Sequence, residues 1–418
     1  MFTEWQQRSG ECELESKQKN RGAAQANIGA HYLRVFDSRY DVTKRCAIVH
    51  YWLIGMRGGE KVIEALCRLF PQADIFTLFY EPERVSALIR SHRVTASFLN
   101  PFRRYHRSFL PLMPVALEHF DLRGYDLVIS SESGPAKGVI TSSNARHICY
   151  CHSPMRYLWD LYPAYLHEWT RSSLKRSLIA PLASYLRVWD YASSARVDEF
   201  IANSGNVQRR IWKAYRRASE IIYPPVQVET FYSRPADDYY LIVSELVTYK
   251  RIADAVRCFS ETKRRLKIVG RGPEYVALKL IAGPTIEFCG RVSDSELRDL
   301  YARCRAVVLP GEEDFGIVPV EAMASGKPVI ALGKGGVLET VPEENPRAGF
   351  FYAQPGKDSL SATVDAFERV EGSLSTTAIR ALASRFSEER FQREMRRMIL
   401  RGQIMSQPES PPRRYASR

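Results

Sequence analysis

The sequence lacks any uninterrupted run of about 18 apolar residues, the length that a helix needs to cross a bilayer. Its N-terminus, Met1 to about Val42, also lacks the apolar segment of a secretory signal. We therefore expect neither a transmembrane helix nor an export signal. Region 1–43 is polar and mixed in charge, and we expect an extended or disordered segment there, or a start site placed too early.

Cysteine is sparse, and recognisable metal and nucleic-acid motifs are missing. The eight cysteines among 418 residues are scattered, most of them in apolar strand or helix contexts, as is typical of reduced buried thiols. There is no Asp-x-Asp pattern and no zinc-finger, ribonucleoprotein or helix-turn-helix motif. The sequence therefore predicts no bound metal, no cofactor and no nucleic-acid partner.

Basic residues are in excess, since 60 Lys and Arg against 47 Asp and Glu give a net charge of +13. An anionic membrane surface or the phosphates of a substrate would match this charge. Two stretches, Phe98–Met113 and Ser172–Leu186, mix apolar residues with arginines, as segments that bind anionic bilayers do. For the stretch Phe98–Met113, membrane contact and burial in a core are equal alternatives. For the stretch Ser172–Leu186, burial in a core is favoured.

The pattern of elements predicts an α/β fold. A chain of this length favours two domains, and short apolar strands alternate with helices in both halves, as in doubly wound parallel sheets. The strands are expected at 46–54, 75–79, 125–130, 148–151 and 199–202, and then at 240–244, 266–269, 286–289, 306–309, 329–332 and 349–352.

Segment boundaries follow from changes in composition. We expect two Rossmann-like domains that face a central cleft, joined by a linker rich in proline and polar residues. The segments are an N-terminal extension at 1–43, a first domain at 44–225, the linker at 226–238, a second domain at 239–387, a helix at 388–401 that crosses back to the first domain, and a disordered tail at 402–418.

The most informative stretch begins at Glu313 and ends at Glu321. The strand at 306–309 precedes it and a helix follows, so Glu313 lies in a loop at the carboxyl end of a strand and Glu321 lies about two turns into the helix. The start of a helix attracts phosphate, because its first backbone N–H groups lack partners. These groups lie around Phe315, Gly316 and Ile317. Two carboxylates beside a phosphate site could bind sugar hydroxyls and a ribose, which predicts a nucleotide-sugar site.

Together with the strand Pro328–Ala331 and the turn Gly333–Gly336 before Glu339, this stretch resembles the donor site of the family-four retaining glycosyltransferases of the GT-B type. The similarity is to the mannosyltransferase-like members that build polysaccharides, and it runs from about Lys44 to about Ile399. It implies an acceptor-binding first domain and a nucleotide-sugar-binding second domain.

The resemblance implies roles for individual residues. Three of them would be catalytic: Lys250 at the leaving phosphate, Glu313 at the sugar, and His152 facing the transferred sugar. Further donor contacts are implied at Gly58, Gly59, Arg251, Gly270, Gly290, Arg291, Val292, Phe315, Gly316, Ile317 and Glu321, and anion or acceptor contacts at Lys137 and Arg156.

One position departs from the family pattern. Relatives carry an arginine five residues before the phosphate-binding lysine, whereas this chain carries Glu245. A carboxylate there would repel a pyrophosphate. We expect Arg57, Arg251 or Arg271 to compensate, or the donor to be held differently.

The resemblance also implies a reaction. We expect a hexose, mannose from GDP-mannose, to pass with retention to a lipid-linked glycan acceptor, with the leaving phosphate accepting the acceptor's proton. A UDP-hexose donor and a degenerate, non-catalytic GT-B binding protein are the alternatives. The expected location is cytoplasmic, peripheral on the inner face of the plasma membrane.

Overall fold

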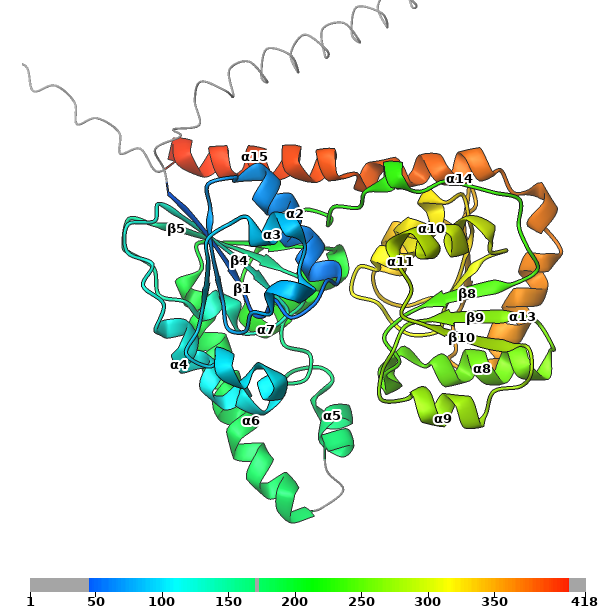
Figure 1. Ribbon diagram of the computed structural model, residues 1–418, viewed down its shortest axis with the longest axis horizontal. Helices are drawn as coiled ribbons and strands as arrows, with labels where there is room; N and C mark the ends of the chain where they lie inside the picture. The colour runs from blue at the N-terminus through cyan, green and yellow to red at the C-terminus, as the bar shows by residue number, and fades with distance from the viewer. Residues whose placement is uncertain (1–44, 170–172, 406–418) are drawn as a thin grey trace, which may run out of the picture. The chain divides into compact units, whose positions relative to one another are not determined.

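The computed structural model of the chain describes residues 45–169 and 173–405 (Figure 1). The chain divides into two units, Met1–Arg45 and Cys46–Arg418, and the fold described below is that of the second. The predictions for 1–43 and for the tail beyond Met405 concern residues outside the described ranges.

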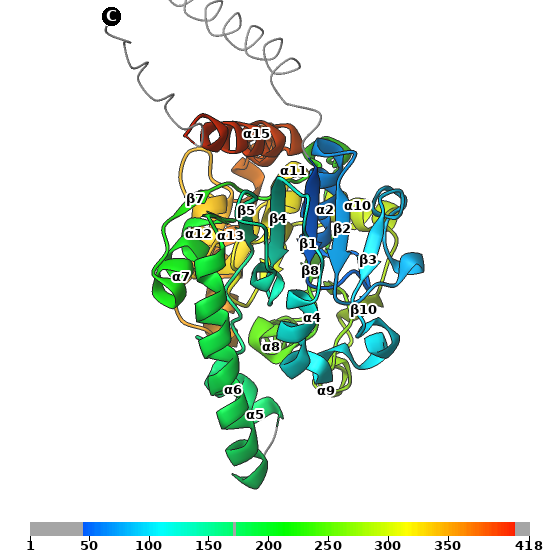
Figure 2. The same ribbon diagram turned by 90° about the vertical axis from the view of Figure 1, so that its left-hand side faces the viewer.

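The first half of this unit is built on a seven-stranded parallel sheet, in the order β3-β2-β1-β4-β5-β6-β7, whose strands are spread across the view in Figure 2. Its interior strand β1 is buried along its whole length, as a parallel strand covered by helices on both faces should be. The strands are β1 Cys46–His50, β2 Asp74–Thr77, β3 Val94–Ala96, β4 Leu127–Glu132, β5 Arg146–Cys151, β6 Glu199–Ala202 and β7 Ser219–Ile221.

Two strand predictions for this sheet were too long, and two strands were missed. β1 ends at His50 rather than at 54 and β2 ends at Thr77 rather than at 79, because the chain then bends and pairs only through a single bridge between Leu53 and Tyr80. The missed strands β3 and β7 are three-residue edge strands without a fully buried residue, so they carry almost no apolar signal.

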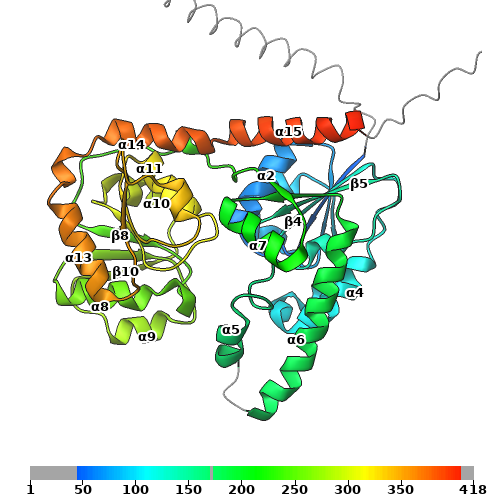
Figure 3. The same cartoon turned by 180° about the vertical axis from the view of Figure 1, so that it is seen from behind.

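Helices surround this sheet, and α2 packs on β1 and β4. The long helix α6 and the shorter α5 are visible in Figure 3. The helices are α2 Gly58–Leu69, α3 Ala87–Arg90, α4 Met113–Glu118, α5 Tyr162–Trp169, α6 Ser173–Ser193 and α7 Gly205–Tyr215. The basic stretch predicted from 98 to 113 forms a series of 3-10 turns, η2 Asn100–Leu112, before α4.

The second half holds a six-stranded parallel sheet in the order β10-β9-β8-β11-β12-β13. All six predicted strands lie within one residue of the observed bounds, because each is a short run with apolar residues between polar turns. The strands are β8 Tyr240–Val243, β9 Leu266–Val269, β10 Ile286–Gly290, β11 Val307–Leu309, β12 Val329–Leu332 and β13 Gly349–Tyr352. The prediction of an α/β fold with two doubly wound halves is confirmed.

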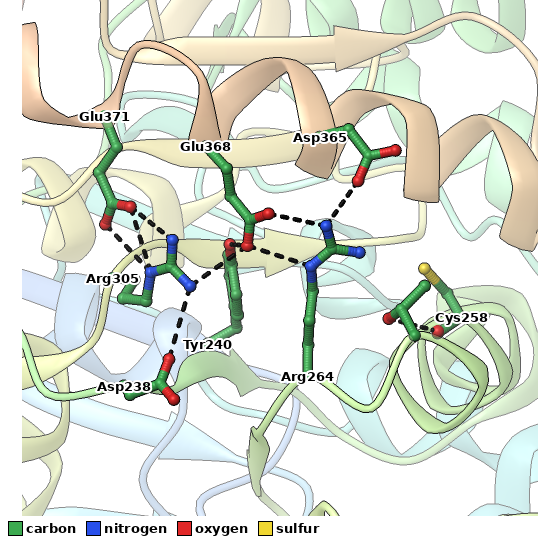
Figure 4. A network of polar contacts seen from close by, with 9 residues as sticks. Asp238, Tyr240, Cys258, Arg264, Arg305, Asp365, Glu368 and Glu371 are labelled. Atoms are coloured by element: carbon green, nitrogen blue, oxygen red, sulfur yellow. Dashed lines mark hydrogen bonds and ion pairs between the residues drawn. The ribbon is translucent and has the colours of Figure 1, made fainter.

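Helix α13 packs on β12 and β13, and an ionic network links it to the strands (Figure 4). Arg264 contacts Glu368 at 2.7 Å and Arg305 contacts Glu371 at 2.6 Å. The helices of this half are α8 Ile252–Glu261, α9 Tyr275–Leu280, α10 Asp294–Arg303, α11 Ile317–Ala324, α12 Val337–Thr340, α13 Lys357–Glu368 and α14 Thr376–Ala383.

The last helix, α15 Glu388–Met405, packs against α2 of the first half. Arg68 of α2 binds Glu388 at 2.8 Å, and Arg390 donates to the carbonyl of Tyr223 at 2.7 Å. The helix extends to Met405, four residues past its expected end at 401. All seven described cysteines are free thiols, and six of them are buried.

Candidate functional site

Glu313 and Lys250 come together at the carboxyl ends of two neighbouring strands. Glu313 follows β11, and Lys250 ends the short turn η6 (Thr248–Lys250) that follows β8, the strand paired with β11. The Lys250 Nζ lies 2.5 Å from Glu313 Oε1, and the two side chains are 16% and 22% exposed. The structure therefore places the predicted phosphate-binding cation and the predicted sugar-binding carboxylate side by side and open to solvent.

The loop that carries Glu313 is fixed by the turn after β12. The Gly336 N–H donates to the Glu313 carbonyl at 2.8 Å, and Glu313 forms a bridge with Gly335. Gly335 has a φ of +77°, and a Cβ there would lie 2.3 Å from the Glu313 carbonyl oxygen, so a side chain at this position would displace the loop. The predicted turn 333–336 thus acts by shaping the backbone around Glu313.

Helix α11 begins immediately after this loop, with Gly316 as its N-cap. Glu321 lies in its second turn, where it accepts a hydrogen bond from the Tyr301 hydroxyl at 2.7 Å and where burial raises its pKa. The Phe315 ring is buried between Tyr223 and Phe386, at 5.6 and 5.5 Å. Phe315 can therefore meet a ligand through its backbone only.

The remaining predicted donor residues of the second half lie at the same edge of the sheet. The Gly270 N–H donates to the Gly290 carbonyl at 2.8 Å, which joins the ends of β9 and β10. Arg291 is exposed, and Val292 packs partly against the core. The Arg251 guanidinium, in contrast, is occupied by Asp254, to which its Nε donates at 2.9 Å.

In the first half, His152 follows β5, and its Nε2 lies 2.9 Å from the Ser131 hydroxyl. Burial, and then the neighbouring His50, lower the pKa of His152 to about 3, so the imidazole is neutral at neutral pH. A Cβ at Gly59 would lie 3.7 Å from this Nε2, and one at Gly58 would lie 2.8 Å from Ile317 Cδ1. The glycine turn thus brings His152 into the neighbourhood of the start of α11.

The prediction of an anion contact at Lys137 is wrong in this structure. Lys137 is completely buried and forms an ion pair with Asp190, and its Nζ lies 3.6 Å from Glu132 Oε1. The Trp159 and Tyr215 side chains donate to the same Asp190 carboxylate at 2.7 and 2.9 Å. The ammonium group therefore stabilises the core and has no access to a ligand.

Arg156 also faces carboxylates in this structure, and its predicted anion or acceptor contact stays a prediction. Its guanidinium lies 3.3 Å from Asp314 and 3.8 Å from Glu312, on either side of Glu313 in the sequence. Arg210 of α7 contacts the same two residues at 2.8 and 2.6 Å. Arg210 was missed, since an arginine on a helix surface carries no motif. The three consecutive acidic residues 312–314 were the signal that cations must lie nearby.

Glu245, the departure from the family pattern, lies between two arginines. Its carboxylate is 3.9 Å from Arg57 and 3.8 Å from Arg107, and all three side chains are more than a third exposed. Compensation by Arg57 was among the expectations, whereas Arg107 of η2 was not. The carboxylate is thus partly neutralised.

The basic stretch around η2 exposes several aromatic rings. Phe98 and Phe102 are each 51% exposed and Tyr105 is 69% exposed, beside the exposed Arg104 and Arg107. Within the ranges 45–169 and 173–405, no helix is long and apolar enough to cross a membrane.

Known proteins match both halves. A family model described as Glycosyltransferase Family 4 matches residues 56–230, and one described as Glycosyl transferases group 1 matches residues 230–382. The O-antigen chain mannosyltransferase RfbU of Salmonella typhimurium is 30% identical over 159 residues, which is 35% of this chain and 45% of the relative. Human alpha-1,3/1,6-mannosyltransferase ALG2 is 31% identical over 121 residues, 28% of each chain.

The chain spans less than half the length of these curated relatives. Among solved structures, Anabaena HepE in complex with UDP-glucose superposes with a TM-score of 0.63 at 16% identity, over 85% of this chain and 99% of that chain. The two consecutive family matches, the paired parallel sheets and the Lys250–Glu313 geometry agree: the chain belongs to the family-four glycosyltransferases of the GT-B type.

Proposed function

We propose that this protein is a retaining glycosyltransferase that moves a hexose, mannose from GDP-mannose, to a lipid-linked glycan acceptor in polysaccharide biosynthesis. The observation that carries the proposal is the Lys250–Glu313 pair at the carboxyl ends of β8 and β11, directly before the start of α11. Two relatives whose names describe mannosyltransferases support mannose as the sugar.

The site residues divide the chemistry among them. The bond between the anomeric carbon and the phosphate oxygen breaks, and the negative charge of the leaving diphosphate develops beside Lys250 and the first N–H groups of α11. With donor bound, the diphosphate replaces Glu313 as the partner of Lys250, and Glu313 accepts hydrogen bonds from sugar hydroxyls. The new bond forms to the acceptor hydroxyl, whose proton passes to the leaving phosphate.

The remaining side chains of the site position the two substrates. His152 is neutral, so it can hydrogen-bond a sugar hydroxyl without adding a charge. The Tyr301 hydroxyl holds one oxygen of Glu321, and the other oxygen remains for a ribose hydroxyl. The protein thus contributes electrostatics and positioning.

A UDP-hexose is the alternative donor. The base would be read by backbone near Gly290–Val292, and a backbone contact of this kind does not say whether the base is guanine or uracil. The structurally similar Anabaena HepE was solved in complex with UDP-glucose, which is the reason to test UDP-sugars alongside GDP-mannose. A non-catalytic GT-B protein is the third possibility, motivated by Glu245. Arg57 and Arg107 weaken that argument, because they offset its charge.

The acceptor side of the proposal rests on the first half. The exposed rings of Phe98, Phe102 and Tyr105 lie beside exposed arginines on the 3-10 turns of η2 and just before them. Aromatic side chains and arginines together suit the headgroup region of an anionic bilayer. We infer that this surface holds the enzyme on the cytoplasmic face of the membrane that carries its acceptor.

A donor screen tests the proposal. The purified chain is incubated with GDP-mannose, UDP-glucose and UDP-galactose, and donor binding and release of the nucleoside diphosphate are measured for each. We expect turnover with GDP-mannose that Glu313→Gln lowers about 10²–10³-fold, whereas Glu287→Gln, on an exposed glutamate of β10, leaves it unchanged. Turnover with a UDP-sugar would support a UDP-hexose as the donor. Donor binding without turnover would support the hypothesis of a non-catalytic GT-B protein.

A further inference from the structure

The two residues that flank Glu313 are bound by arginines of the first half. Arg210 donates through Nη2 to Glu312 Oε1 at 2.6 Å, and its Nη1 lies 2.8 Å from Asp314 Oδ1. Arg156 lies 3.3 Å from Asp314 and 3.8 Å from Glu312. Both guanidinium groups are largely buried, at 15% and 17% exposure, so solvent screens these ion pairs less than surface pairs.

A second set of contacts ties the same loop to the start of α7. The Ser204 hydroxyl, which caps α7, donates to the Asp314 carbonyl at 2.7 Å. The Gly205 N–H donates to the Glu339 carboxylate at 2.9 Å, and the Asn206 N–H donates to it at 3.3 Å. Glu339 belongs to α12, which follows the turn that supports Glu313. Side chains and backbone thus fix the loop from both sides.

The charge balance of this cluster depends on both arginines. Asp160 lies 3.2 Å from Arg210 and 3.4 Å from Arg156, so three carboxylates share two guanidinium groups. Burial raises the pKa of Asp314, although Arg156 and Arg210 oppose that effect. Removal of either arginine would leave like charges in contact, and the loop from Glu312 to Asp314 would relieve the repulsion by moving.

These contacts determine where Glu313 points. Side chains alternate along an extended segment, and the contacts follow that alternation: Glu312 and Asp314 bind arginines of the first half, and Glu313 binds Lys250. An error of about 1 Å in the placement of a group at the reacting centre can lower a rate about 100-fold.

We propose that Arg210, assisted by Arg156, is a positioning residue that holds Glu313 in register with the transferred sugar. Through it, the first half of the chain controls the geometry of the donor site in the second half. The inference rests on the proposed function of Glu313. It assigns a role to residues that contact the loop on either side of Glu313.

Arg210→Met tests this, with Arg209→Met as the matched control, since Arg209 is the exposed neighbour on the same helix. We expect kcat for sugar transfer to fall about 100-fold in Arg210→Met. The Kd for the free nucleoside diphosphate, GDP or UDP according to the donor turned over, should change less than twofold, because that ligand lacks the sugar. Arg209→Met should match the unaltered protein in both.

A charge-matched double variant separates the misplacement of Glu313 from a general loss of folded structure. Glu312→Gln combined with Arg210→Met removes one of the three carboxylates that contact Arg210, so that less repulsion remains in the cluster. We expect this double variant to recover part of the lost kcat, and Arg210→Lys should also recover part of it. Should Arg210→Met fail to fold, Glu312→Gln probes the same contact from the other side. A kcat in Arg210→Met equal to that of Arg209→Met, while Glu313→Gln is inactive, would overturn the positioning role and leave the proposed function intact.

If the protein turns over none of the donors, the proposed function is contradicted, but the positioning role of Arg210 is not. The positioning role is then read from amide hydrogen exchange over residues 312–317. Exchange there must accelerate in Arg210→Met and not in Arg209→Met, and equal exchange in the two variants would refute it.

Discussion

The two halves of the chain share one architecture but keep their charged side chains in different places. In the first half, Glu132, Lys137 and Asp190 lie together in the core without any exposure. In the second half, Lys250 and Glu313 are partly exposed at the strand ends, and the arginines of Figure 4 lie near the surface at the opposite edge of the sheet. A doubly wound sheet can therefore enclose charged groups in its core or present them at its strand ends, where a ligand could reach them.

The difference shows why a charged residue in the right stretch of sequence is weak support for a site. Lys137 and Lys250 both follow buried parallel strands by a few residues. Lys137 turns inward, where Asp190 and the ring of Tyr215 surround it, the latter at 4.7 Å. Lys250 stays at the edge of the sheet. The direction of the side chain, set by partners distant in the sequence, decides the role.

The largest effect should come from the buried cluster. Lys137→Met leaves two buried carboxylates without their cation, and breaking a buried pair costs about 3–5 kcal/mol. We expect the free energy of unfolding in urea to fall by that amount. Lys357→Met, which removes an exposed lysine paired with Glu261, should leave it nearly unchanged. Equal stability of the two variants would show that Lys137 is not a structural residue.

In the second half, the corresponding substitutions should spare the fold and remove the activity. Glu313→Gln and Lys250→Ala each remove one proposed electrostatic contact to the sugar or the leaving phosphate, and loss of such a contact typically costs about 10²–10³-fold in kcat. Steady-state kinetics together with thermal unfolding measure both properties. Near-normal turnover in either variant would break the assignment of this edge of the sheet as the donor site.

Much of the second half could be predicted from the sequence, because its signals are local. Short apolar runs between polar turns mark its six strands. Gly335 and Gly336 are required where the backbone passes within van der Waals distance of Glu313 and Asp314, and such glycines are visible in the sequence. The proximity of Lys250 to Glu313 follows from the pairing of their strands.

The roles of Lys137 and Arg210 could not be predicted, because their partners are remote in the sequence. Lys137 meets Asp190 across 53 positions, and Arg210 meets Glu312 across 102. No local pattern distinguishes Arg210 from its exposed neighbour Arg209. The extents of β1 and β2 were also overestimated, since apolar residues continue past the point where the chain bends into Leu53 and Leu78 of the core.

A smaller effect is expected on membrane binding, which we assign to the first half of the chain. The exposed aromatic and basic stretch belongs to the first half, and each arginine near an anionic surface contributes about 1 kcal/mol. We expect the double variant Arg103→Ser, Arg104→Ser to bind vesicles of anionic lipid about 30-fold more weakly, with donor hydrolysis unchanged. Arg107 is left in place because it contacts Glu245.

The matched control is Arg396→Ser, Arg397→Ser, which removes the same charge from exposed positions on α15. Co-sedimentation with neutral and anionic vesicles at two salt concentrations measures the binding, which should weaken as salt rises, since the Debye length is about 8 Å at physiological salt. If the two double variants lose binding equally, net charge alone is responsible. Equal binding of the unaltered protein to neutral and anionic vesicles would remove the membrane surface from the proposal.

The smallest effect should come from Glu245, where the two halves meet through exposed charges. Its contacts with Arg57 and Arg107 are long, and such surface ion pairs contribute about 0–1 kcal/mol. Glu245→Arg replaces a carboxylate near the expected pyrophosphate with a cation but also places three arginines together. We therefore expect donor affinity to stay unchanged or to rise by up to about fivefold, a change worth about 1 kcal/mol.

Titration calorimetry measures the donor affinity, and Glu245→Gln separates loss of the carboxylate from gain of a cation. If Glu245→Arg abolishes donor binding while Glu245→Gln does not, the added cation disrupts Arg57 and Arg107, and these two arginines contribute directly to holding the donor. If both variants lose binding, Glu245 itself supports the site, and its difference from the family pattern is a functional adaptation of this chain.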